Sequence, residues 1–135
     1  MKLIDLIFCD DIRCELGFKY TLCGVYQHNI FIPENVHWPV RLQKFCILAK
    51  VECSETAPAT GTLLVQRDGE EAKPISSFDF TGKKLESVFI PFVFPVFSVA
   101  KPGPLSFILD IECNGKKEKL VCKNCIEFKK AEPVA

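Results

Sequence analysis

The last third of the chain carries the pattern that most restricts its fold, two extended segments in which apolar and polar residues alternate. Asn114-Gly115 lies between them, and this dipeptide is typical of a two-residue type I′ turn joining antiparallel strands. Alternation with a period of two places every second side chain on the same face of a strand. The pattern predicts a hairpin over residues 105–128, with an apolar face made by Leu105, Phe107, Leu109, Ile111, Cys113, Leu120, Cys122, Ile126 and Phe128.

The rest of the chain repeats this kind of segment, and no stretch of ten or more residues has helical periodicity. Turn-forming residues separate the segments, notably Gly17, Asp68-Gly69 and Gly82. Short strands with turns between them are typical of an all-β fold, an antiparallel β-sandwich of about seven to eight strands. We expect an immunoglobulin-like topology, with a jelly roll or a C2-like sandwich as the alternative. The expected extended segments are residues 2–9, 19–31, 42–53, 62–67, 72–80, 86–99, 105–113 and 116–128.

The length of the chain, 135 residues, is ordinary for one domain with its own core. We therefore expect a single domain over residues 1–130 and a loose C-terminal tail over residues 131–135. The longest apolar stretch, residues 88–99, is too short to be a membrane helix, and residues 1–11 lack the features of a signal peptide. A cytoplasmic protein is expected.

The most apolar segment, residues 86–99, contains two prolines and four phenylalanines. Pro91 and Pro95 lack the N–H groups that one side of the strand needs for a ladder, so we predict an edge strand or one kinked between two sheets. Strand parity predicts that Phe89 and Phe97 share one face and that Phe92 and Phe94 share the other. An edge strand that is apolar on both faces needs a cover, either a loop of the same chain or another protein chain.

A second feature is the charged cluster of Asp10, Asp11, Arg13 and Glu15, which we expect in a short connection between two strands. The simplest interpretation is structural, with the acids capping a turn and pairing with the arginine. The same residues are nevertheless a candidate binding site. Paired carboxylates also allow a cation-binding or hydrolytic site at Asp10, Asp11 and Glu15.

The only tryptophan, Trp38, lies in a predicted loop over residues 33–39. An aromatic side chain on a loop can anchor a partner in a pocket. It can equally fold back as a plug over the end of the sandwich. The sequence is compatible with both interpretations.

The chain has eight cysteines, and for a cytoplasmic protein we expect free, mostly buried thiols. Cys122 and Cys125 form the only CxxC motif. A structural zinc site usually needs a second such motif or paired histidines, and strand parity places the two side chains on opposite faces. A small metal- or thiol-dependent protein using this pair is the alternative function.

The opening of the chain contains the pattern Cys9-Asp10-Asp11-x-Arg13-x-Glu15-x-Gly17-x-Lys19-x-Thr21-Leu22-x-Gly24-Val25-Tyr26. It resembles the start of an uncharacterised family of small bacterial domains. The resemblance covers about the first quarter of the chain and implies a bacterial or phage origin and a sandwich-type fold. It implies no activity, because the family has none assigned.

Charge and motifs together limit the function. The chain has seventeen basic and seventeen acidic residues and no formal net charge, which does not favour nucleic-acid or membrane binding but weakens repulsion between copies. Nucleophile elbows, phosphate-binding loops and dinucleotide fingerprints are absent from the sequence. We therefore expect no enzyme and no cofactor, but a protein-binding or assembly module that recognises a protein partner or forms a homodimer.

Overall fold

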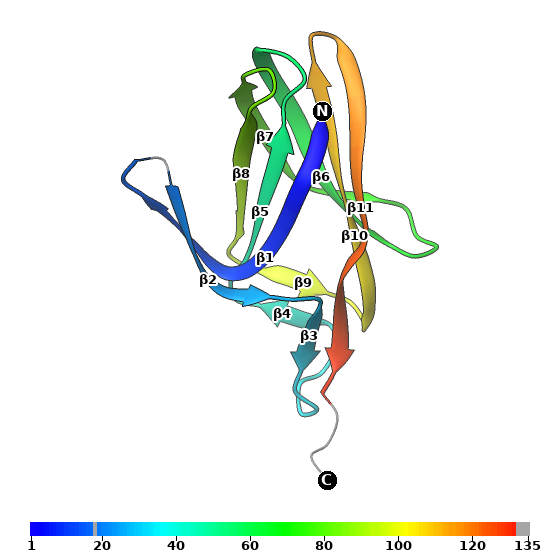
Figure 1. Cartoon of the computed structure of the whole chain (residues 1–135). Helices are drawn as coiled ribbons and strands as arrows, with labels where there is room; N and C mark the ends of the chain where they lie inside the picture. The colour runs from blue at the N-terminus through cyan, green and yellow to red at the C-terminus, as the bar shows by residue number, and fades with distance from the viewer. Residues whose placement is uncertain (18, 132–135) are drawn as a thin grey trace.

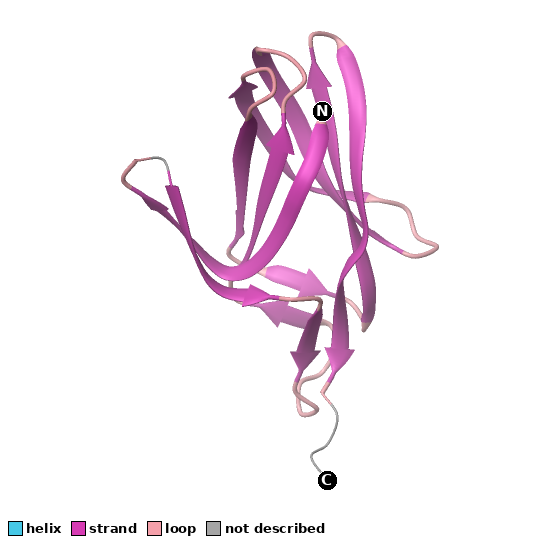
Figure 2. Cartoon of the chain, viewed as in Figure 1, coloured by secondary structure: helices cyan, strands magenta, loops and turns pink. Residues whose placement is uncertain are grey.

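The computed structural model describes residues 1–17 and 19–131, and these residues form eleven strands. Figures 1 and 2 show strands joined by short loops, with no helix in the described part of the chain. No membrane-spanning helix was found among these residues. The all-β prediction is confirmed. The predicted tail lies outside the described residues except for Ala131, whose N–H donates to the carbonyl of Ile32 at 2.8 Å.

A four-stranded sheet forms one layer, in the order β2-β1-β5-β8, with every neighbouring pair antiparallel. The first strand is unusually long and has different partners along its length. Residues 2–9 pair with β5, whereas residues 8–15 pair with β2. The four strands are β1 (Lys2–Glu15), β2 (Lys19–Tyr26), β5 (Phe45–Glu52) and β8 (Ser87–Phe94).

A five-stranded sheet forms the other layer, in the order β3-β11-β10-β6-β7. The predicted hairpin of the last third is confirmed, and its turn has positive φ at both Asn114 (52°) and Gly115 (76°), as a type I′ turn requires. Strand β3 pairs with β11 in parallel, and the other pairs are antiparallel. The strands are β3 (Asn29–Ile32), β6 (Ala57–Arg67), β7 (Lys73–Gly82), β10 (Gly103–Cys113) and β11 (Lys116–Lys130).

The remaining two strands, β4 (Val40–Leu42) and β9 (Phe97–Val99), pair with each other across one end of the layers. Eleven strands replace the seven or eight expected because the predicted segments 19–31, 42–53 and 86–99 each contribute two strands. In all three places the chain leaves one sheet and enters another.

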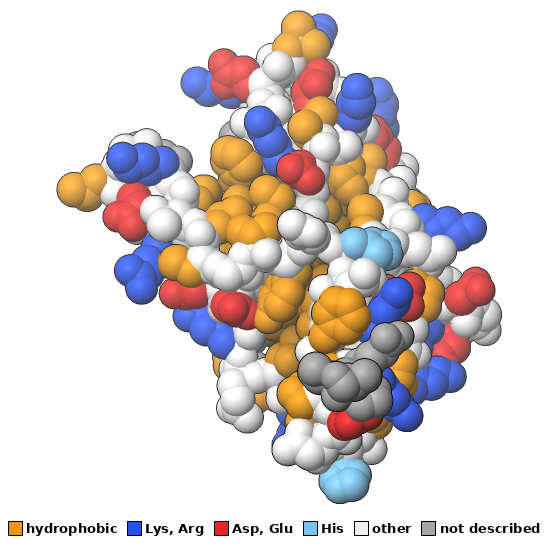
Figure 3. Space-filling model, turned by 60° about the horizontal axis from the view of Figure 1, so that its bottom comes forward, with side chains coloured by type: hydrophobic (Ala, Val, Ile, Leu, Met, Phe, Trp, Pro, Cys, Tyr) orange, Lys and Arg blue, Asp and Glu red, His pale blue; other side chains and the backbone are white. Residues whose placement is uncertain are grey.

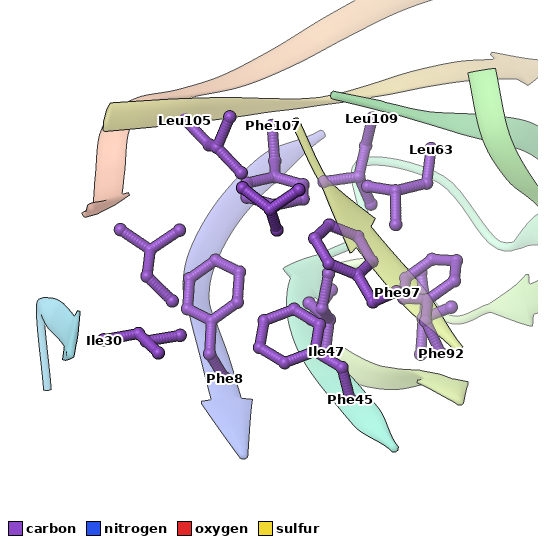
Figure 4. Packing of buried hydrophobic residues seen from close by; sticks show 14 of the residues in the cluster. Phe8, Ile30, Phe45, Ile47, Leu63, Phe92, Phe97, Leu105, Phe107 and Leu109 are labelled. Atoms are coloured by element: carbon purple, nitrogen blue, oxygen red, sulfur yellow. The ribbon is translucent and has the colours of Figure 1, made fainter. Parts of the chain in front are cut away.

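The hydrophobic core lies between the two larger sheets (Figure 4). Phe45 is central, with its ring centroid 5.9 Å from that of Phe8, 4.7 Å from that of Phe97 and 6.4 Å from that of Phe128. These rings come from β5, β1, β9 and β11, so aromatic packing joins both layers and the end strands. Such pairs add to the hydrophobic stabilisation of a core.

Two predicted strand limits are wrong. The first strand does not end at Cys9 but continues to Glu15, since β2 pairs with it along this length and satisfies its backbone groups. The predicted segment over residues 62–67 begins too late, because β6 begins at Ala57, where it pairs with Gly82 of β7. The hairpin turn at Asp68-Gly69 is confirmed, and Gly69 has a φ of 74°.

The predicted edge position of the Phe-rich segment is confirmed, because β8 is the last strand of its sheet. Pro91 lies opposite Leu48 of β5, and within the described residues β5 is the only strand that pairs with β8. The segment is also divided between two sheets, since the chain passes Pro95 and Val96 and continues as β9. Both alternatives of the prediction therefore describe this segment.

Candidate interaction surface

The outer half of the β1–β2 hairpin projects from the body of the molecule (Figure 1). We call residues 10–17 and 19–25 the arm. Beyond Cys9 the first strand has left β5 and is paired with β2 alone. Leu16, at the tip, is 93% exposed, and Gly17 turns the chain with a φ of 85°, a conformation that favours glycine. A large apolar side chain is thus presented at the end of a two-stranded ribbon.

The predicted charged cluster lies along the arm rather than in a connection, so that prediction is wrong. Asp11 accepts from Lys44 Nζ at 2.6 Å, and its other oxygen is 3.6 Å from Arg13 Nε. The hydrogen bond from Lys44 lowers the pKa of Asp11. Glu15 is exposed and lies opposite Lys19 at the end of the arm. Pairing with cations favours the structural interpretation of these residues.

Asp10 has a different partner, because the Tyr26 hydroxyl donates a hydrogen bond to its carboxylate. Burial, together with this hydrogen bond, raises the pKa of Tyr26 to about 12. Gly24 lies beside Asp10, with a φ of 67°, and a Cβ there would be 2.3 Å from Asp10 Oδ2. The close backbone approach at Gly24 therefore leaves room for the Asp10–Tyr26 contact at the base of the arm.

The arm also touches the Phe-rich edge strand. The rings of Tyr20 and Phe89 meet edge to face, with centroids 5.9 Å apart, and Lys50 Nζ is 5.4 Å from the Phe89 centroid. Phe89 remains 42% exposed and Val93 52% exposed. Figure 3 shows hydrophobic side chains gathered between the tip of the arm and the body of the molecule. We call Leu16, Tyr20, Phe89 and Val93 the arm surface.

The outer side of β5 is buried near this surface. Leu48 and Cys46 are buried although they lie outside the core cluster between the sheets. The thiol of Cys46 donates to the carbonyl of Asp10 at 3.7 Å. Burial on an outer face requires a cover, and the contact of Cys46 with Asp10 shows that the base of the arm supplies part of it.

The predicted grouping of the four phenylalanines is half right. Phe92 is buried and Phe94 packs against the same core, as expected of two residues on one face. Phe97 does not share a face with Phe89, because it is only 6% exposed and packs against Phe45. The prediction assumed that side chains alternate along one continuous strand. The strand is interrupted after Phe94, so the alternation starts again in β9.

Trp38 lies in the β3–β4 loop, apart from the arm. Its side chain is half-buried and packs against the core. It also lines a hollow of about 320 Å³ together with His37 and Lys130. The packing supports the plug interpretation, and the hollow leaves one side of the indole within reach of a ligand.

The two cysteines of the CxxC motif lie on β11, and all eight cysteines are free. Their predicted placement on opposite faces is wrong. Cys125 packs against the core, and its thiol donates to the carbonyl of Cys122 at 3.5 Å. No group of three or more His, Cys, Asp or Glu side chains suited to a metal ion occurs within residues 1–17 and 19–131.

Sequence reasoning did not select Tyr20 and Tyr26 as site residues. A hairpin turning at Gly17 places residues whose numbers add up to 34 opposite each other, as in the pair Phe8 and Tyr26. This register would have placed Tyr26 diagonally beside Asp10. The contact of Tyr20 with Phe89 has no such local signal, because it depends on how the arm bends.

Neither the comparison with protein-family models nor the comparison with curated proteins gives a match. The resemblance of residues 9–26 to a bacterial family stays a prediction.

Proposed function

We propose that this chain is a non-enzymatic protein-binding or assembly module that engages its partner through the arm surface. The observation that carries the proposal is the projecting arm with Leu16, 93% exposed, at its tip. Exposed apolar groups on a projecting element favour burial against another protein. A second copy of the chain is one such partner, since the absence of net charge leaves little repulsion between copies.

The backbone of the arm supports the same proposal. Strand β2 is the outermost strand of its sheet, so one side of it has N–H and C=O groups without a neighbouring strand in the described part of the chain. Such an edge can accept an additional strand from a partner. The other outer strand of this sheet, β8, contains Pro91, which cannot donate to an added strand. The edge at β2 is therefore the better docking site.

The acidic residues support a binding role over a hydrolytic one. Asp11 is paired with Lys44, and Asp10 accepts from Tyr26. A lowered pKa keeps Asp11 ionised near neutral pH, whereas a general acid needs a carboxyl group that holds its proton there. These carboxylates hold the arm in place in our proposal and perform no proton transfer.

We also infer that the sandwich is immunoglobulin-like. In that topology the first, second and fifth strands are neighbours in one sheet, and the third, sixth and seventh form the other. The neighbours β1-β5-β8 and β11-β10-β6 follow this order if β2, β3, β4 and β9 are treated as additions, so that β5, β6, β8, β10 and β11 count as the second, third, fifth, sixth and seventh strands. A cytoplasmic location and a bacterial or phage origin belong to the same proposal.

Light scattering during gel filtration, together with a pull-down from cells of bacterial origin, tests the proposed function. The variant Leu16→Asp should abolish self-association or partner retention, because it places a charge where an apolar contact forms. Val121→Asp is the matched control, since Val121 is 57% exposed on β11, in the other sheet. A protein that is strictly monomeric and retains no partner contradicts the proposal. So does equal loss of association in both variants.

A further inference from the structure

Strand β11 contains an irregularity centred on the CxxC motif. Cys122 lies opposite Phe107 and Ile126 lies opposite Leu105. Residues 123–125 therefore occupy the space that Ser106 alone occupies on the neighbouring strand. The Ser106 hydroxyl accepts from the Asn124 N–H at 2.9 Å, and Asn124 has a φ of 48°. The strand therefore bulges between Cys122 and Ile126.

This bulge brings the two cysteines close to each other. The Cys125 thiol lies 3.5 Å from the carbonyl of Cys122 and 3.8 Å from the carbonyl of Leu105, so it is held beside the backbone of Cys122. A disulfide requires Cα atoms within about 4.4–6.8 Å. Residues 122–126 lie opposite residues 105–107 of β10, a length of two strand residues or about 7 Å. The bulge therefore draws the backbone of the two cysteines toward the separation that a bond between their sulfurs needs.

Two other cysteine pairs are neighbours in the fold, and both are less accessible. Cys9 and Cys46 lie opposite each other on β1 and β5, and both are buried. Cys53 is also buried, and its neighbour Cys113 is partly exposed. Cys122 and Cys125 are both partly exposed. Among these three pairs, only the pair on β11 consists of two partly exposed residues.

We propose that Cys122 and Cys125 form a redox-active dithiol site that closes reversibly to an intramolecular disulfide. The oxidant is a low-molecular-weight disulfide of the glutathione class. The Cys122 thiolate attacks one sulfur of that disulfide, forms a mixed disulfide and releases one thiol. Cys125 then loses its proton and attacks the Cys122 sulfur, which forms the protein disulfide and releases the second thiol. Two protein thiols are oxidised and one disulfide is reduced to two thiols.

The surroundings of the two sulfurs differ, since Cys125 packs against the core and its thiol faces the carbonyls of Cys122 and Leu105. Burial and the adjacent Cys122 thiol raise the pKa of Cys125, so this cysteine retains its proton. A thiolate is the attacking species in exchange, which makes Cys122 the first nucleophile and Cys125 the resolving thiol. Closure removes the S–H donor that now points at the Leu105 carbonyl, so it changes the contact between β11 and β10 at this point.

Tryptic peptide mapping of the intact chain tests the proposal directly. The reduced protein is equilibrated with mixtures of glutathione and glutathione disulfide, quenched in acid, alkylated and digested. Lys123 stands between the two cysteines, so trypsin separates them unless a disulfide joins their peptides. We expect the joined peptides to accumulate as the oxidised fraction of glutathione rises, in a protein that remains monomeric on a non-reducing gel, and to separate on reduction with dithiothreitol.

The variants Cys122→Ser and Cys125→Ser should each abolish the joined peptides. Cys14→Ser is the matched control and should leave them unchanged, since Cys14 is exposed on the arm. Uptake of glutathione by Cys14 shows that the oxidant has reached the protein. If Cys122 and Cys125 in that sample are alkylated or carry separate glutathiones, the proposal is overturned. A disulfide between two chains would also overturn it.

A second measurement requires only the wild-type protein. Phenylarsine oxide binds two neighbouring thiols at once, so it should protect Cys122 and Cys125 together from alkylation while Cys14 stays reactive. Independent alkylation of both cysteines in its presence would show that the thiols do not act as a pair.

Discussion

Tyr26, Asp10 and Gly24 illustrate how single residues fix the base of the arm. The phenol donates to the carboxylate, and the glycine opposite provides the space for it. Cys9 lies next to this group, and burial raises the pKa of its thiol to about 11. Tyr26, Asp10 and Cys9 are therefore packed together at the base of the arm. The stability of this region should depend on their protonation states.

We predict that Tyr26 ionises well above the ordinary range in the folded protein. Its pKa is about 12 in the fold against 10.0 as the ordinary value. Because the pKa of Tyr26 is higher in the folded protein than in the unfolded one, its contribution to the free energy of unfolding is fully present below about pH 10. This contribution is lost as the pH rises toward 12. Phenolate absorbance during an alkaline titration measures this step, and Tyr26→Phe should remove it.

Asp10→Asn provides the control for the cause of this shift. It removes the carboxylate charge but keeps an acceptor oxygen, so the Tyr26 step should move to lower pH. Burial is the larger cause of the raised pKa, so part of the shift should remain in this variant. A Tyr26 titration at its ordinary pKa in the wild type would contradict the contact at the base of the arm.

At the scale of whole elements, the break between β8 and β9 decides what the Phe-rich segment does. Before the break, Phe92 faces the core and Phe89 faces outward beside Tyr20. After it, the chain pairs with β4, and Phe97 packs between Phe45 and Phe128. One apolar segment thus supplies both the end of the core and part of the arm surface.

This division predicts that two chemically identical substitutions lower the free energy of unfolding by very different amounts. Phe97→Ala should lower the free energy of unfolding by about 3–5 kcal/mol, because it leaves a cavity in the core. Phe89→Ala should lower it by about 1 kcal/mol or less, since an exposed ring loses mainly its contact with Tyr20. Urea denaturation of both variants measures the difference. Equal losses of free energy in the two variants would contradict this prediction, because they would mean that the two rings lie in the same environment, as strand parity alone predicts.

At the scale of the molecule, the sandwich and the arm differ in how many elements support them. Strands β5 and β10 lie inside their sheets with a neighbour on each side, whereas the arm consists of two strands paired mainly with each other. Opening of a two-stranded ribbon exposes little apolar surface, so its local free energy of opening is small. The arm can therefore adjust to a partner while the sandwich stays folded.

Amide hydrogen exchange followed by mass spectrometry should separate these two parts. We expect β5 and β10 to exchange slowest and the arm fastest at low protein concentration. If the arm carries self-association, its protection should rise with protein concentration while that of the core strands stays constant. Arm amides that are as slow as those of β5 in the monomer would show that the arm belongs to the same cooperative unit.

The chain itself was enough to predict the all-β class, the hairpin over residues 105–128 and the edge position of the Phe-rich segment. These features follow from local rules, because alternation and turn residues act between neighbours in the sequence and proline removes its own N–H group.

Only the tertiary structure decided where strands pass between sheets, where parity is reset and which distant residues meet. The length of β1 depends on its pairing with β2, the contact of Cys125 with the backbone of Cys122 depends on a bulge opposite Ser106, and Tyr20 reaches Phe89 through the bend of the arm. Such outcomes depend on backbone groups finding partners far away in the sequence, and a pattern read along one strand contains no information about the strand beside it.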